Sequence, residues 1–148
     1  MPNLILSNSL SQPSGGPKSD EYKINEAFGT DEGIFLDNNA NLATVLGTFN
    51  VTATSNNGSG YATVSNIIPY TTYTYSVKLV AKAAVGTTTI AIGDGVNDTT
   101  YANVSATSNG NTYTGTFVPT ISTITLSLIV GNSGRVSKWD DIKLYEDF

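Results

Sequence analysis

The stretch "YTTYTYSVKLVAK", residues 70–82, decides the fold class of this 148-residue chain. From residue 72 to residue 79 its side chains alternate between polar and apolar. Successive side chains of a β-strand point to opposite faces, so the alternation predicts a strand with one face in a core and one in water. The expected inner set is Tyr73, Tyr75, Val77, Leu79 and Ala81, and the expected outer set is Thr72, Thr74, Ser76, Lys78 and Lys82.

The same period-2 pattern recurs from residue 34 to the end, and no segment shows a sustained apolar repeat at helical spacing. Turn sequences such as "SNNGSG", "TSNGN" and "GNSG" separate the alternating stretches. This organisation predicts an all-β, antiparallel β-sandwich, a jelly roll of about eight strands. Further inward positions are Ile90, Ile92, Tyr113, Phe117, Ile124, Leu126, Leu128, Val130, Ile142 and Leu144.

The predicted domain division places the sandwich at residues 34–148. Residues 1–33 are expected to form an irregular N-terminal arm that holds a first strand and a loop. One helical turn is expected within "SDEYKINEAF", residues 19–28, where Ser19 can cap and Tyr22 can pack.

The composition narrows the chemistry. The chain has no histidine and no cysteine, which removes the commonest general base and every thiolate metal site. Seven Lys and Arg against twelve Asp and Glu give a net charge of −5, so no basic stripe for phosphates is available. We therefore expect no enzyme activity, no cofactor and no nucleic-acid partner.

The N-terminal sequence "MPNLILSNSLSQPSGGP" has no positive n-region and only a short apolar run. A signal peptide and a membrane span both need longer apolar segments. We expect synthesis in the cytoplasm without a signal peptide, and no membrane partner.

The closing stretch "KWDDIKLYEDF", residues 138–148, raises the question of a carboxylate pair. Adjacent strand residues face opposite ways, so Asp140 and Asp141 cannot converge on one substrate atom. Because Ile142 and Leu144 are expected to face the core, the alternation predicts that Asp140 also faces inward and that Trp139 faces outward. An inward carboxylate needs backbone N–H groups or a cation, so Asp140 is either a hydrogen-bonded structural residue or a calcium ligand.

The oxygen-rich segment "GDGVND", residues 93–98, superficially resembles a calcium loop. It lacks the bidentate Glu and the spacing of such loops, whereas Asp-Gly between alternating stretches is typical of a hairpin turn with positive φ. We interpret it as a turn. Apart from the weak calcium candidate Asp140, no metal site is expected.

Aromatic rings that face outward are the remaining chemical resource, because sugar rings stack on them. The alternation leaves Tyr61, Tyr101, Trp139 and Tyr145 as possible exposed rings, and the first three are the candidate glycan-binding platforms. The alternative is that these rings pack at the edge of the core, as scattered aromatics on a sandwich often do.

Read in order, five segments resemble the jelly-roll carbohydrate-binding modules of the galactose-binding-like fold. They are "NLILSNS", "SNNGSGYATVSNIIPYTTYTYSVKLVAKA", "TTIAIGDGVN", "NTYTGTFVPTISTITLSL" and "VSKWDDIKLYE". The resemblance covers the chain from Tyr61 onward and a first strand at residues 3–7. It implies that Asp140 and Asp141 belong to the closing-strand signature. Ser9 and Leu10 stand where the family commonly has the acidic residue that joins the closing Asp on calcium.

The same fold is reused on tailed-phage virions, and an initial Met, no export signal and no attached catalytic domain favour that use. We therefore predict a non-enzymatic virion structural protein, a capsid decoration or cement protein, or a tail-associated one; the alternative is a free-standing glycan-binding module. The expected partners are the major capsid protein or other virion subunits, further copies as a homo-oligomer on the particle, and a surface glycan. The expected assembly contacts in the arm are Leu4, Ile5, Leu6, Pro13 and Pro17.

Overall fold

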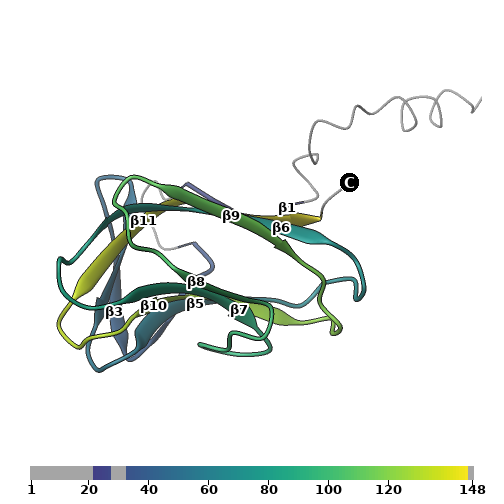
Figure 1. The fold of residues 1–148 in the computed structure, drawn as a ribbon, viewed down its shortest axis with the longest axis horizontal. Coiled ribbons are helices and arrows are strands. Elements are labelled where there is room, and N and C mark those ends of the chain that lie inside the picture. Colours follow the sequence, from purple (N-terminus) through teal and green to yellow (C-terminus); the bar gives the residue numbers. More distant parts are fainter. Residues whose placement is uncertain (1–21, 28–32, 147–148) are drawn as a thin grey trace, which may run out of the picture.

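The computed structural model describes residues 22–27 and 33–146, and there the chain forms a sandwich of two antiparallel sheets (Figure 1). The predicted fold class is confirmed. The described strands are β1 (Tyr22–Glu26), β2 (Leu36–Asn38), β3 (Ala40–Val45), β4 (Thr48–Ala53), β5 (Gly58–Val64), β6 (Tyr73–Lys82), β7 (Thr88–Gly93), β8 (Ala102–Ser105), β9 (Thr112–Phe117), β10 (Ile124–Val130) and β11 (Val136–Glu146).

The two sheets stack as two layers, with β6, β9 and β11 in the upper layer of Figure 1 and β7, β8 and β10 in the lower. The six-stranded sheet has the order β3-β4-β11-β6-β9, and β1 also pairs with β11. The five-stranded sheet has the order β2-β5-β10-β7-β8. The structure has more strands than the about eight that the sequence predicted. The alternation pattern is hard to recognise in short strands, and β1, β2 and β8 have only five, three and four residues.

The core lies between the layers, where the parity argument put it. Every residue of β6 from Tyr73 to Leu79 alternates between buried and partly exposed, as the opening stretch predicted. The inward residues of the other strands are also buried, apart from the partly exposed Tyr113. These confirmed core residues are Ile90, Ile92, Phe117, Ile124, Leu126, Leu128, Val130, Ile142 and Leu144.

The predicted orientation of Trp139 and Asp140 is wrong, and a β-bulge is the reason. Asp140 pairs with Lys78 and Lys143 with Ser76, so two residues of β11 face one residue of β6. Asp141 takes the left-handed conformation, with a φ of 48°. The extra residue resets the alternation, so Trp139 points into the core together with Ile142 and is 0% exposed.

Residues 22–26 form a strand rather than the expected helical turn. Ile24 pairs with Leu144 and Glu26 with Ile142, so β1 continues the sheet beyond the end of β4. Pairing with the edge of β11 beyond β4 favours a strand at these residues. The division into residues 1–33 and 34–148 stays a prediction, because residues 1–21 and 28–32 lie outside the described residues.

We expect Leu126→Ala to lower the free energy of unfolding by about 2–5 kcal/mol, the usual range for a cavity left by a buried leucine. Leu126 is fully buried in the central strand of the five-stranded sheet. The exposed Thr114 of β9 supplies the control, since Thr114→Ala should change stability by less than about 0.5 kcal/mol. Urea unfolding measures both. Equal effects of the two substitutions would contradict the assignment of the core.

Candidate functional site

One end of the sandwich presents an exposed aromatic residue. The β5–β6 loop and the β9–β10 loop meet there, since the backbone N–H of Tyr70 donates to the Pro119 carbonyl at 2.7 Å. Tyr70 is 78% exposed and has a φ of 63°. Left-handed backbone is rare for a bulky residue, so the loop holds this ring outward against a local steric preference. With Ile68 and Val118, both also exposed, Tyr70 forms what we call the loop-end patch.

A column of stacked rings fixes both loops of the loop-end patch. Phe117 stacks on Tyr73 at a centroid distance of 6.0 Å and on Tyr101 at 5.9 Å. At one end of the column the Tyr73 hydroxyl accepts the Ile68 N–H at 2.9 Å. At the other, the Tyr101 hydroxyl accepts the Thr120 N–H at 3.1 Å. The buried Tyr73 and the partly exposed Tyr101 thus each hold one loop, and the backbone that carries Tyr70 is fixed.

Of the three predicted platforms, Tyr101 belongs to this column and Trp139 to the core. Tyr101 is partly exposed, with one face stacked on Phe117, so it matches the alternative reading of edge packing. The Trp139 indole N–H donates to the Ser137 hydroxyl at 2.7 Å inside the protein. A fully buried ring has no face for a sugar, so Trp139 is not a platform.

Tyr61, the third predicted platform, lies on the outer face of the five-stranded sheet. It is partly exposed and stands between Leu36 of β2 and Ser127 of β10. The centre of this face is buried even though it points away from the core: Ser59 and Ser127 are both 0% exposed.

The β7–β8 loop covers this face. The Asn97 N–H donates to the Ser127 hydroxyl at 2.9 Å, and its side-chain amide donates to the Asn57 carbonyl at 2.9 Å. "GDGVND" is therefore a hairpin connection, as interpreted, although the positive φ falls on Asn97 rather than on the Asp-Gly pair. The covering loop leaves Tyr61 beside an occupied surface instead of in an open groove.

Asp98 fixes the base of this loop. Its carboxylate accepts the Thr100 hydroxyl at 2.6 Å and the Asp94 N–H at 2.7 Å. These two hydrogen bonds, the one from Thr100 first, lower the pKa of Asp98 below its usual value. The same carboxylate lies against Gly93, where a Cβ would clash with it. The Asp98 carboxylate is thus used within the turn.

The side chain of Asp140 takes part in the bulge. Its carboxylate accepts the backbone N–H of Asp141 at 2.8 Å, within the bulge. Among the residues that the structure describes, no group of three or more Asp or Glu side chains could hold a metal ion. The proposed arm contacts Leu4, Ile5, Leu6, Pro13 and Pro17 lie outside the described residues.

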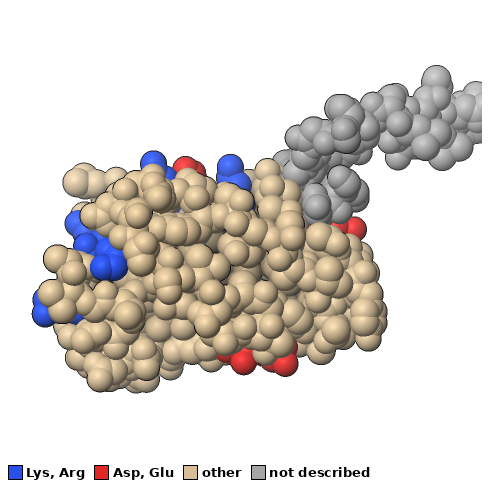
Figure 2. Space-filling model, in the orientation of Figure 1, with Lys and Arg blue, Asp and Glu red and all other residues tan. Residues whose placement is uncertain are grey.

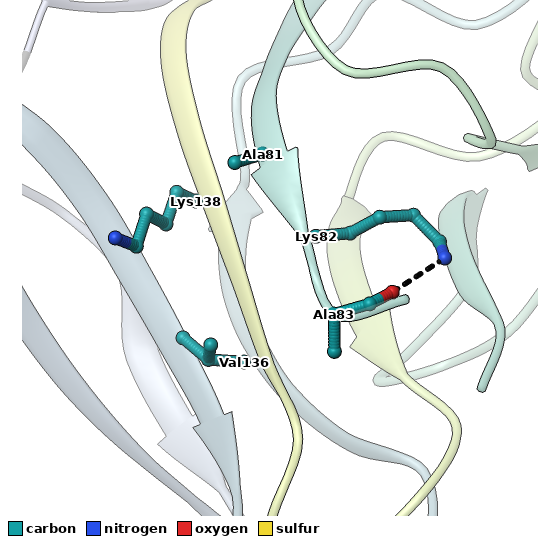
Figure 3. Close-up of a pocket in the computed structure, with 5 residues that line it drawn as sticks. All are labelled: Ala81, Lys82, Ala83, Val136 and Lys138. Carbon is teal, nitrogen blue, oxygen red and sulfur yellow. Dashed lines mark hydrogen bonds between the residues drawn. The ribbon is translucent and has the colours of Figure 1, made fainter. Parts of the chain in front are cut away.

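A pocket of about 220 Å³ opens on the outer face of the six-stranded sheet. Ala81, Lys82, Ala83, Val136 and Lys138 line it, and we call it the Ala–Lys pocket (Figure 3). The two lysines extend to opposite sides of it in Figure 3, and the Lys82 ammonium group donates to the Ala83 carbonyl at 2.7 Å.

Ala81 was predicted to face the core, and the structure corrects this. Lys138 pairs with Ala81 and Trp139 with Leu79, so Val80 is an extra residue that reverses the alternation of β6. Ala81 consequently lies on the same face as Lys138, and the pocket exists because of this second bulge.

The described basic residues gather on one sheet, whereas described Asp and Glu side chains lie on both sheets. Lys23, Lys78, Lys82, Lys138 and Lys143 are on strands of the six-stranded sheet, and Arg135 directly precedes β11. Figure 2 shows these positive groups over the upper layer and at the left end of the molecule, and acidic groups on the upper surface, at the right and at the lower edge. The described strands and loops of the five-stranded sheet carry acidic side chains and no Lys or Arg.

Sequence reasoning missed Tyr70 as a candidate. It placed "IIPY" in a turn but drew its platforms from strand parity. The available signal was the Pro-Tyr pair itself: an aromatic residue that follows proline in a turn between strands has no sheet face to pack on.

No protein family model matches the sequence, and no curated protein matches it. Solved structures do match the fold. The xylan-binding family 22 carbohydrate-binding module of Paenibacillus barcinonensis Xyn10C has a TM-score of 0.64 at 13% identity, over 89% of this chain and 98% of that chain. Clostridium thermocellum xylanase 10B, complexed with xylohexaose, has a TM-score of 0.68 at 14% identity, over 86% of this chain and 29% of that chain.

A third similar structure is the enzymatically active domain of tailspike protein 4 of bacteriophage CBA120. Its TM-score is 0.59 at 11% identity, over 85% of this chain and 21% of that chain. At such identities the likeness shows the fold alone. The fold is that of the carbohydrate-binding-module β-sandwiches, as the resemblance implied.

No helix in the described part of the chain is long and apolar enough to span a membrane.

The bonding of Asp98 makes the β7–β8 loop sensitive to acid. Because its folded-state pKa is lowered, this carboxylate contributes stability that is present above the unfolded pKa and is lost as the pH falls through the folded pKa. The backbone N–H of Asp94 donates to the Asp98 carboxylate. We therefore expect the NMR chemical shift of this amide to change with pH, with a midpoint below the ordinary pKa of aspartate. Asp98→Asn should abolish that titration. An unchanged titration in this variant would show that Asp98 is not its source.

Proposed function

We propose that the protein is a non-catalytic carbohydrate-binding β-sandwich and that Tyr70 is its principal sugar platform. The observation that carries this proposal is the exposed Tyr70 ring in left-handed backbone, held by a rigid pair of loops. Sugars stack their apolar C–H faces on such rings. A platform fixed before binding loses little conformational entropy when the ligand arrives.

The chemistry around Tyr70 suits a neutral saccharide. The two loops, residues 65–72 and 118–123, contain no Asp, Glu, Lys or Arg. Their exposed polar groups are hydroxyls and an amide, at Ser65, Asn66, Thr120 and Ser122. These groups can exchange hydrogen bonds with sugar hydroxyls beside the stacked ring.

The similarity to a xylan-binding module and to a xylanase solved with xylohexaose supports this class of ligand. Glycosidases cleave with a pair of Asp or Glu carboxylates, and the two loops around Tyr70 contain neither residue, which supports binding without hydrolysis. Tyr61 is a weaker platform, because the β7–β8 loop occupies the face beside it.

We expect Tyr70→Gly to abolish glycan binding without loss of stability, because glycine accepts positive φ freely while the ring is removed. Tyr70→Phe keeps the ring and should bind within a few-fold of the native affinity. A neutral-glycan array followed by calorimetry, with xylohexaose as the first probe, measures binding, and thermal melting checks the fold. Native-like binding by the glycine variant would exclude Tyr70 as the platform.

A tail-associated role on a phage particle is the second candidate, and the similarity to the tailspike domain favours it. The two candidates are compatible, since a particle protein can carry a glycan-binding surface. For this role we expect deletion of residues 11–18 to leave the sandwich folded and to weaken attachment to particles. Co-sedimentation of the chain with purified particles measures attachment. Equal attachment of the native and shortened chains would contradict a role of residues 11–18 in attachment to the particle.

A further inference from the structure

Beside the loop-end patch lie two hydroxyl groups that are bonded to each other, those of Tyr101 and Thr120. Their oxygens are 3.1 Å apart. The backbone N–H of Thr120 also donates to the Tyr101 oxygen at 3.1 Å. Each hydroxyl therefore fixes the position of the other, and we call the two groups the hydroxyl pair.

The hydroxyl pair stands on a rigid base. The Tyr101 ring stacks on Phe117 at a centroid distance of 5.9 Å. The backbone N–H of Tyr101 donates to the Ile92 carbonyl at 2.8 Å. Phe117 and Ile92 are both buried. A polar group held in this way loses little conformational freedom when a ligand binds to it.

The hydroxyl pair carries one more O–H group than its internal bond uses. A tyrosine or threonine hydroxyl has one proton to donate and can also accept. The bond between the two oxygens uses one of the two protons, whichever residue donates it. The second proton has no acceptor within the pair, and the threonine oxygen keeps a free lone pair. A fixed group that both donates and accepts is complementary to a sugar hydroxyl, which does the same.

The hydroxyl pair is accessible and lies next to the proposed platform. Thr120 is exposed and Tyr101 is partly exposed. Thr120 directly follows Pro119, whose carbonyl accepts the Tyr70 N–H at 2.7 Å. This hydrogen bond brings the backbones of Tyr70 and Thr120 together at the same end of the sandwich.

We propose that the hydroxyl pair determines specificity for the sugar that stacks on Tyr70, by binding one free hydroxyl group of a neutral oligosaccharide. This inference rests on the proposed function, because Tyr70 supplies the stacking. The pair donates its spare O–H to the sugar oxygen, and the Thr120 oxygen accepts the sugar O–H. A methyl or acyl group on that sugar oxygen removes the proton and adds bulk. The site therefore distinguishes an unsubstituted chain from one that is substituted at this position.

Calorimetry with xylohexaose as the first probe, and with its mono-O-methyl derivatives, tests the hydroxyl pair. For the native chain, methylation of one particular hydroxyl should weaken binding about tenfold, as expected for the loss of one hydrogen bond. Thr120→Val keeps the shape of the side chain and removes its hydroxyl. This variant should bind the parent oligosaccharide about tenfold more weakly than the native chain does. It should bind the methylated derivative no more weakly than the parent.

Two further variants separate a contact with the sugar from an effect on the loop. Tyr101→Phe keeps the ring on Phe117 and should lose the same preference for the free hydroxyl as Thr120→Val. Ser122→Ala removes another exposed hydroxyl of the β9–β10 loop and should retain the preference. Thermal melting checks that each variant is folded.

The outcomes separate this inference from the proposed function. If Thr120→Val weakens binding equally for the parent and every derivative, the hydroxyl pair does not contact the sugar, and the inference is overturned while Tyr70 remains the platform. Native-like binding by Tyr70→Gly would contradict the proposed function itself. A native chain that binds no neutral oligosaccharide would overturn both.

Discussion

The sandwich depends on the β-bulge at Asp140 and Asp141 in β11. This strand pairs with β6 along one edge and shares its other edge between β4 and β1. The bulge lies where that second edge passes from β4 to β1. Its extra residue lets Trp139 and Ile142 both enter the core, so the strand contributes buried side chains on either side of the change of partner. The two carboxylates of the closing strand therefore serve the architecture.

The ordered sheet then makes the functional end rigid. β6 and β9 align Tyr73 with Phe117, and the Tyr101 ring completes the column that holds the two loops beneath Tyr70. Burial raises the pKa of the neighbouring Tyr75, which keeps that phenol neutral inside the sheet. The exposed ring of Tyr70 thus rests on a fixed base, and the proposed glycan recognition depends on this arrangement.

Strand alternation was sufficient to predict the all-β sandwich and its central core residues, such as Val77, Ile90 and Leu126. It failed at Trp139 and Ala81 for one physical reason: a bulge inserts a residue that the period-2 pattern does not record. Such insertions depend on which strands become neighbours, and a single sequence does not state that.

The candidate site was less predictable than the core. The prediction that Tyr61 lies on an outer face was correct. The β7–β8 loop covers this face through Asn97, and no sequence pattern indicates that cover. Tyr70 was missed because its exposure follows from loop geometry. Tyr101 was proposed as a platform, but its hydroxyl serves the Thr120 amide. Side-chain roles in loops depend on long-range partners, which alternation cannot reveal.

The measurement that tests the central claim most directly is an NMR titration of the native chain with a neutral oligosaccharide found by array. Amide shift changes map the contact without any substitution. We expect them to concentrate in residues 65–72 and 118–123, around Tyr70. Changes confined to the outer face of the five-stranded sheet, around Tyr61 and the β7–β8 loop, would contradict the account, as would the absence of any glycan that shifts these resonances.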